Sequence, residues 1–429
     1  MNPLVRRIAV LSLVGAALAT AVTGTGTDMG TSVGDSGAAL AATTTTPGPA
    51  PASPRPPLDQ AALQAALRVR PDDHAAGAIA LVAEPGQVWR GSSGDTVTGK
   101  RIPDNSHFHI GSISKTFEST VVLQLAAEGR IDLNRPIQHY LPGLLPDTFQ
   151  PITVRQLLNF TSGLPDVLEG APPQSTDEQI AHRYDYQTFD QIIQETLRPA
   201  DRPRPGPRFA PGTKQEYNSL GFRIAGKLIE RITGHSFKNE VTARILRPLR
   251  LDRTSVPQDD PRMPRPYLHG YLINSAGEPV DVSEQGGDPS NMISTPADLD
   301  RFITALFQGR LLPTAQLEEM FTLPRDEDDK VVPYADASNC LSPDGRPGPA
   351  CFGLGLMSVP LPDGTVLWGK TGHDYGYANG MFATRDLSLR GVYSISTTSS
   401  DNGRPNPISD RLLLAAVAPT SKYRPQAES

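Results

Sequence analysis

The chain has 429 residues, of which 38% are apolar and 20% charged, and its formal net charge is −6. A chain of this length and apolar content can build a large hydrophobic core. The mildly acidic balance argues against a nucleic-acid partner or an anionic membrane surface, since both call for clustered Lys and Arg.

The N-terminal segment carries the features of a secretory signal. Arg6 and Arg7 precede an apolar run, residues 8–22, and small residues follow it, so we expect a signal peptide over 1–41. A membrane anchor is the alternative, but the run is shorter than the roughly 20 apolar residues that span a bilayer. Residues 42–57 are rich in Pro and Thr and lack apolar periodicity, which predicts a disordered linker. We therefore expect a secreted protein with no membrane span in its mature chain.

The folded domain is expected over residues 58–420, followed by a tail, 421–429. Apolar periodicity predicts helices at 59–69, 116–128, 154–160, 189–196, 220–233, 296–307 and 408–417. Alternating or short apolar runs predict strands at 77–83, 87–90, 354–359, 365–369, 380–384 and 391–397. This order favours an α+β fold, with an antiparallel sheet built from both ends of the chain and covered by the terminal helices. A mostly helical subdomain would be inserted between the two ends.

A possible nucleophile stands at the start of the second predicted helix. Ser112 and Lys115 form an S-x-x-K motif, and residues three apart share one helix face, so the lysine can reach the serine hydroxyl. A serine hydroxyl needs a base to become nucleophilic, and a lysine kept partly neutral by burial and nearby cations can serve. A capping serine beside a surface lysine is the alternative interpretation of this motif alone.

Two further motifs follow in the chain, Tyr217-Asn218-Ser219 and Lys370-Thr371-Gly372. In this order the three motifs resemble those of the serine β-lactamase and DD-peptidase superfamily, in its class C β-lactamase-like and low-molecular-weight carboxypeptidase branch. The flanking sequence segments that share the resemblance are FHIG at 108–111, LLNFTSGLPD at 157–166 and FAPG at 209–212. The resemblance covers roughly residues 60–418. It implies a β-lactamase/transpeptidase-like fold.

The resemblance also implies a role for each residue in acylation. Ser112 would be the acylated nucleophile, Lys115 its proton acceptor and Tyr217 the proton relay to the leaving group and the deacylating water. The backbone N–H groups of Ser112 and His373 would form the oxyanion hole. No cofactor and no metal ion are implied.

The remaining motif residues are implied to bind the substrate. Lys370 and Thr371 would hold its terminal carboxylate, and Gly372 would let the strand approach it closely. Ser219 departs from the family, which usually has asparagine there, and a hydroxyl reaches less far than an amide. Asn218 is one position off and would face another way. The His373 side chain is either a pH-sensitive substrate contact or an exposed loop histidine.

The leading hypothesis is therefore a D-alanyl-D-alanine carboxypeptidase that acts on peptidoglycan peptides and binds penicillin. A class C-like β-lactamase, an esterase or D-aminopeptidase of the same fold and a non-catalytic penicillin-binding sensor are the alternatives. The expected partners are a small peptide or β-lactam substrate and the cell-wall peptidoglycan, and the protein is expected to be a monomer. His107 and His109 could suggest a metal pair, but packing before the nucleophile is favoured because no third ligand accompanies them.

The chain has two cysteines, Cys340 and Cys351, in a segment rich in Pro and Gly. In an oxidising compartment they would close a disulfide, whereas in a reducing one they would stay free thiols. We predict that the secreted protein begins between Thr20 and Ala42 and contains this disulfide. N-terminal sequencing and a thiol assay check both points; an intact Met1 or two free sulfhydryls would contradict them.

Overall fold

The structure is a computed structural model that describes residues 57–94, 99, 101–167, 175–200, 203–336, 339–340, 342, 346–361, 364–398 and 406–417. The predicted signal, 1–41, the predicted tail, 421–429, and all of the predicted linker except Pro57 lie outside the described residues.

The helices are α1 (Gln60–Leu67), α2 (Ser114–Ala127), α3 (Ile137–Tyr140), α4 (Val154–Leu158), α5 (Thr176–Ala181), α6 (Phe189–Leu197), α7 (Leu220–Thr233), α8 (Phe237–Val241), α9 (Arg247–Leu249), α10 (Pro296–Phe307), α11 (Thr314–Phe321) and α12 (Pro407–Val417). Shorter helical turns are η1 (Pro71–Asp73), η2 (Gly111–Ile113) and η3 (Thr242–Leu246). The strands are β1 (Ala75–Glu84), β2 (Gln87–Gly94), β3 (Phe108–His109), β4 (Tyr271–Ile273), β5 (Pro279–Asp281), β6 (Ile293–Ser294), β7 (Met357–Pro360), β8 (Val366–Asp374), β9 (Tyr377–Thr384) and β10 (Arg390–Thr397).

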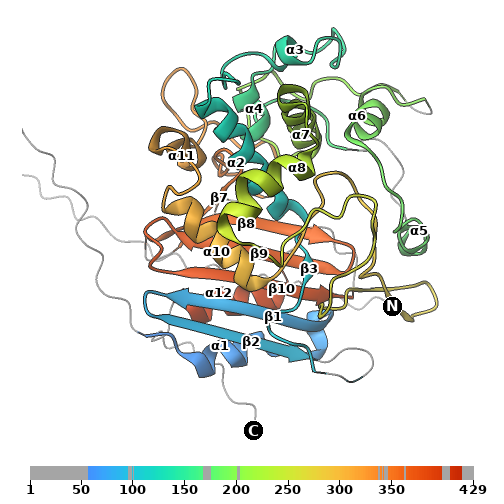
Figure 1. The fold of residues 1–429 in the computed structure, drawn as a ribbon, viewed down its shortest axis with the longest axis vertical. Helices are drawn as coiled ribbons and strands as arrows, with labels where there is room; N and C mark the ends of the chain where they lie inside the picture. The colour runs from blue at the N-terminus through green and yellow to red at the C-terminus, as the bar shows by residue number, and fades with distance from the viewer. Residues whose placement is uncertain are drawn as a thin grey trace, which may run out of the picture. The chain divides into compact units, whose positions relative to one another are not determined.

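A six-stranded antiparallel sheet in the order β2-β1-β10-β9-β8-β7 forms the centre of the fold (Figure 1). Strands from the two ends of the described chain lie side by side, with Ile79 of β1 opposite Ser394 of β10. The helices between β3 and β7 gather on one side of this sheet (Figure 1). The predicted α+β architecture, a sheet from both chain ends with an inserted helical part, is confirmed.

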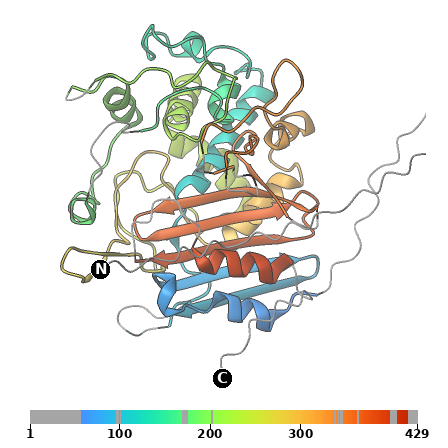
Figure 2. The ribbon, with the colours of Figure 1, turned by 180° about the vertical axis from the view of Figure 1, so that it is seen from behind.

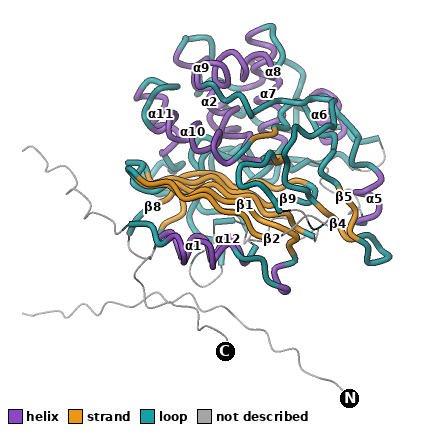
Figure 3. The backbone as a smooth tube through the Cα atoms, turned by 60° about the horizontal axis from the view of Figure 1, so that its bottom comes forward, coloured by secondary structure: helices purple, strands orange, loops and turns teal. Residues whose placement is uncertain are grey.

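The two faces of the sheet pack against different helices. Because side chains alternate along a strand, Ala78 and Ala80 of β1 join the smaller apolar cluster with α1 and α12, whereas Ile79 joins the larger one. Figures 2 and 3 show α1 and α12 on one face and α10 with α2 on the other. No helix of the described residues is long and apolar enough to cross a membrane.

Helix α2 is the central helix of the larger core. It is buried on nearly every side, and its Phe117 ring stacks on Phe302 of α10 with 3.6 Å between ring centroids. A helix surrounded in this way has little freedom to move, so it holds its first turn in a fixed place relative to the sheet.

Cys340 and Cys351 are joined by a disulfide.

Several element boundaries differ from the sequence prediction, and two of these differences concern Ser112 and Lys370. Ser112 lies in the η2 turn just before α2 rather than in the helix itself, because Gly111 has a positive φ of 52° and the Ile113 N–H bonds to the Ile110 carbonyl at 3.2 Å. Strand β8 continues to Asp374 instead of ending at residue 369, since its pairing with β9 continues to Asp374 opposite Tyr377. The Lys370 motif is therefore part of the sheet.

Candidate active site

Three side chains from two distant segments meet at the start of α2. The Ser112 Oγ lies 2.6 Å from the Tyr217 hydroxyl, and the Lys115 ammonium donates to the same Oγ at 3.0 Å. Tyr217 comes from the loop before α7 and is held by its backbone N–H, which donates to the Tyr334 hydroxyl at 2.9 Å. The structure thus brings together the three residues to which the resemblance assigned acylation.

Tyr217 lies between two lysine ammonium groups. The Nζ atoms of Lys115 and Lys370 are 5.5 and 4.8 Å from the centre of its ring, and both lysines are almost fully buried. Burial by itself raises the pKa of Tyr217, but the two positive charges and the hydrogen bond with Ser112 outweigh it and bring this pKa down to about 8. Burial also lowers the pKa of Lys370 to about 8, and the neighbouring Lys115 adds to that effect.

This arrangement can activate a serine. A tyrosine whose pKa is brought near neutrality is partly ionised, and its phenolate, hydrogen-bonded to the serine hydroxyl, can take the serine proton as the hydroxyl attacks a carbonyl carbon and can pass that proton to the leaving group. Lys115 touches the same oxygen and can stabilise the negative charge that develops there. The geometry fits nucleophilic catalysis through a covalent acyl-enzyme.

The nucleophile turn is pressed against strand β8. A Cβ on Gly372 would overlap the Ile110 carbonyl oxygen, and a Cβ on Gly111 would lie 2.7 Å from the His373 backbone nitrogen. Glycine at 372 therefore makes room for the turn that carries Ser112, whereas the sequence analysis had assigned it to the approach of substrate. The backbone N–H groups of Ser112 and His373, implied to form the oxyanion hole, belong to these two adjoining segments.

The two residues assigned to the substrate carboxylate are placed apart. The Lys370 ammonium donates to the Thr371 carbonyl oxygen at 3.0 Å and faces the Tyr217 ring, and it is not among the residues that line the cavity at Ser112. The Thr371 side chain lies one position along β8 and lines a different cavity, together with Leu367 and residues of α12. This separation follows from the alternation of side chains along a strand.

Ser219 and Asn218 point in different directions, as expected from their positions. Ser219 lines the cavity of about 210 Å³ that contains Ser112, and its backbone N–H donates to the Asp166 carboxylate at 2.6 Å. Asn218 is buried and turned away, because its amide oxygen accepts the Gly221 N–H at 2.9 Å at the start of α7. Ser219 is thus placed to contact a substrate.

The histidines near the site are neutral at pH 7. His373 is an exposed residue of β8 that lines the Ser112 cavity, where desolvation of the ring together with the Lys370 charge lowers its pKa to about 4. His107 donates through Nδ1 to the Pro266 carbonyl oxygen at 2.9 Å, and His109 donates through Nε2 to the Ser283 carbonyl oxygen at 3.0 Å. Within the described ranges no group of three or more potential metal ligands comes together.

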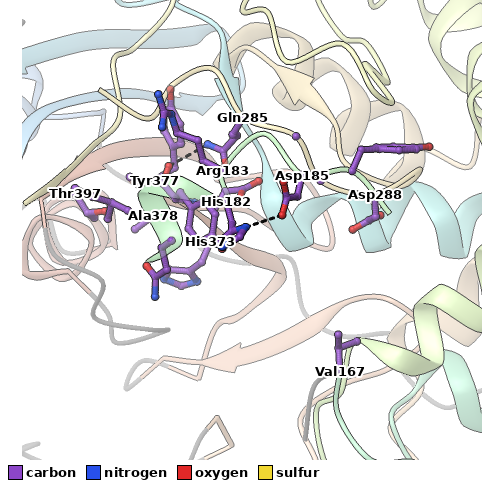
Figure 4. Close-up of a pocket in the computed structure, with 18 of the residues that line it drawn as sticks. Val167, His182, Arg183, Asp185, Gln285, Asp288, His373, Tyr377, Ala378 and Thr397 are labelled. Atoms are coloured by element: carbon purple, nitrogen blue, oxygen red, sulfur yellow. Dashed lines mark hydrogen bonds and ion pairs between the residues drawn. The ribbon is translucent and has the colours of Figure 1, made fainter. Parts of the chain in front are cut away.

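Charged residues that the sequence analysis did not single out also line the Ser112 cavity. Arg223 of α7 pairs with Asp288 at 2.6 Å, and Asp374 ends strand β8 next to His373. These residues also border a second cavity of about 990 Å³, where Figure 4 shows Asp288, Asp185 and His373 on separate segments. One sequence signal could have found Asp374, since it is two residues beyond Gly372 and so shares its face of the strand.

Glu118 is a buried acid one helical turn beyond Lys115. It is fully buried on α2, and neither of its carboxyl oxygens has a hydrogen-bond partner among the described residues. Burial raises its pKa to about 8, although Arg223 and Lys115 act in the opposite direction. The sequence carries no signal for this, because a glutamate at that spacing is equally consistent with an exposed helix face.

Comparison with known proteins identifies relatives across most of the chain. The family model described as Beta-lactamase matches residues 58–416. Esterase EstB of Burkholderia gladioli is 28% identical over 382 residues, which make up 80% of this chain and 91% of the esterase. Among solved structures, a D-stereospecific amidohydrolase from Streptomyces sp. is 32% identical with a TM-score of 0.69, covering 85% of this chain and 100% of that one. The D-amino acid amidase from Ochrobactrum anthropi SV3, solved with L-phenylalanine, is 25% identical with a TM-score of 0.66, over 83% and 97% of the two chains.

The unpartnered Glu118 predicts a pH-dependent loss of stability. Because the folded state raises its pKa from 4.5 to about 8, unfolding releases a proton between these values and becomes more favourable as the pH rises through them. Glu118→Gln removes this titration, so the variant should melt at a higher temperature than the wild type, with a gap that widens from pH 5 to pH 8. Thermal unfolding followed by circular dichroism measures it.

The matched control is Glu284→Gln, an exposed glutamate outside the core. Its melting temperature should follow that of the wild type at every pH. A constant gap between Glu118→Gln and the wild type would show that Glu118 is ionised in the folded protein throughout this range.

Proposed function

The chain belongs to the beta-lactamase family, whose members are serine hydrolases, and on this premise we propose that it is an amidohydrolase for D-amino-acid derivatives. It would cleave the amide bond of a D-amino-acid amide, or of a short peptide that begins with a D-residue, through an acyl-enzyme on Ser112. The proposed substrate class is supported by the activities for which the Streptomyces and Ochrobactrum relatives are named.

The observation that carries this proposal is the position of Lys370. A carboxypeptidase needs a cation that meets the substrate's terminal carboxylate, and the sequence assigned that task to Lys370 with Thr371. In the described part of the chain the residue Lys370 is only 3% exposed, and its ammonium donates to a backbone carbonyl and faces Tyr217. Thr371 lines another cavity. This position supports a role for Lys370 in lowering the pKa of Tyr217 rather than in binding a carboxylate.

The proposed reaction uses each group in turn. Ser112 attacks the amide carbon while its proton passes to Tyr217, and the oxyanion accepts hydrogen bonds from the backbone N–H of Ser112 and of His373. Tyr217 then protonates the departing amine. In the second half the Tyr217 phenolate takes a proton from water as the water attacks the ester, and it returns that proton to the Ser112 Oγ as the acid leaves.

A D-alanyl-D-alanine carboxypeptidase acting on peptidoglycan peptides is the second candidate. It is favoured by the Lys370 ammonium itself, which stands beside the nucleophile's proton relay and would meet a substrate carboxylate if its side chain turned toward the Ser112 cavity. This candidate also predicts acylation by penicillin. The Ser219 hydroxyl reaches less far than the amide that the family usually has at this position. It therefore gives less support to turnover of β-lactams by this candidate enzyme.

We also propose that the protein is exported. The paired arginines ahead of an apolar run support this, and so does the Cys340–Cys351 disulfide, because disulfides persist in oxidising compartments.

The proposed function predicts the order of substrate preference. D-phenylalaninamide should be hydrolysed at least about tenfold more efficiently than its L-enantiomer, and more efficiently than an N-acylated D-Ala-D-Ala peptide. Ammonia or D-alanine release, followed by a coupled assay, gives kcat/KM for each substrate, with Ser112→Ala as the inactive control. Faster release of D-alanine from the peptide than of ammonia from the amide would favour the carboxypeptidase instead.

Lys370→Ala separates the two candidates by a different route. If Lys370 acts through Tyr217, its loss removes a positive charge and raises the pKa of the phenol, so kcat/KM should fall for D-phenylalaninamide and for p-nitrophenyl acetate alike. The rising limb of the pH profile should move to higher pH. A loss confined to the D-Ala-D-Ala peptide, with the ester unaffected and the limb unmoved, would assign Lys370 to carboxylate binding.

A further inference from the structure

Asp374 and Lys370 lie on the same face of β8, on opposite sides of the nucleophile turn. Side chains four residues apart in a strand share a face, and each two-residue step is about 6–7 Å. Gly372, between them, is the position pressed against the Ile110 carbonyl. A basic residue therefore stands on one side of Ser112 and an acidic residue on the other.

Asp374 has no cationic partner among the described residues. One carboxyl oxygen accepts the Tyr375 N–H at 3.1 Å, and the other lies 4.0 Å from Nδ1 of His109. His109 bonds through Nε2 to the Ser283 carbonyl at 3.0 Å, so that nitrogen carries the proton and Nδ1 presents a lone pair. Burial lowers the pKa of His109 to about 4, which keeps this ring neutral.

The neighbouring charges do not compensate Asp374 either. Arg223 forms its ion pair with Asp288 at 2.6 Å, and the Asp288 carboxylate repels a second negative charge. Burial raises the pKa of Asp374 to about 7, and Asp288 raises it further while Arg223 lowers it. The side chain is 24% exposed and lines both the Ser112 cavity and the larger cavity beside it. Its carboxyl group therefore borders the cavity in which a substrate would bind.

We propose that Asp374 receives the free ammonium group of the substrate, so that the enzyme selects D-amino-acid amides and esters with an unblocked amine. This inference rests on the proposed function and names the substrate feature that the site recognises. An α-ammonium is two bonds from the carbonyl carbon, and Asp374 directly follows His373, whose N–H is assigned to the carbonyl oxygen. A substrate ammonium at this position supplies the positive charge that Asp374 lacks among the described residues.

Two esters that differ only in the charge of the amine test this. D-phenylalanine methyl ester and its N-acetyl derivative are compared below the pKa of the amine, by titration of the acid released. The wild type should prefer the ammonium ester. In Asp374→Asn the ratio of the two kcat/KM values should fall about ten- to a hundredfold, mainly through a higher KM for the ammonium ester, because a charge-assisted hydrogen bond is lost.

Two further variants make the result specific. Asp374→Glu keeps the charge and should retain the preference, whereas Asp185→Asn, an exposed acid on the larger cavity that bonds to His182, should leave the ratio as in the wild type. No preference in the wild type, or equal losses on both esters in Asp374→Asn, would overturn the inference. Hydrolysis of D-phenylalaninamide is measured separately, so a failure of the proposed function is recognised even when the ester preference holds.

Discussion

The site depends on two lysine ammonium groups held without solvent around one phenol. Lys115 and Lys370 are both buried, and their charges repel each other, so each gains from a negative charge between them. Tyr217 occupies that position and is hydrogen-bonded to Ser112 at 2.6 Å. Burial alone would raise the pKa of the phenol, but this pKa is near 8 because both ammonium groups attract the phenolate and Ser112 is hydrogen-bonded to it. This coupling gives Tyr217 a pKa at which it can exchange a proton with Ser112.

Such a coupling requires the nucleophile turn and the sheet to stay in register. Two glycines, Gly111 and Gly372, bring the backbones of η2 and β8 into direct contact, and any side chain at either position would force them apart. The buried helix α2 fixes the turn from the other side through contacts such as Phe117 on Phe302. The nucleophile therefore stands where the sheet meets the helical part, and both contribute to it.

The same region contains one buried acid and one partly buried acid that cost stability. Glu118 has no hydrogen-bond partner for either carboxyl oxygen among the described residues, and Asp374 meets a neutral histidine and a second carboxylate. Burying a charge without a partner is unfavourable, and such groups respond by raising their pKa. Groups with strongly shifted pKa values are concentrated at functional sites. Asp374 lines the cavity, where a positively charged ligand can pair with its carboxylate, whereas Glu118 is closed off from solvent.

The sequence by itself determined the local part of this picture. The alternating and helical periodicities predicted the sheet and the major helices, and the three-residue spacing of Ser112 and Lys115 placed their side chains together, because both depend only on neighbours along the chain. Only the tertiary structure decided which groups share a desolvated space. Tyr217 is 105 residues from Ser112, and the burial of Glu118 and the missing cation at Asp374 depend on α7 and on the segment around Asp288. Charge and solvation act through space between distant segments, so the roles of Lys370 and Asp374 could not be derived from their place in the chain.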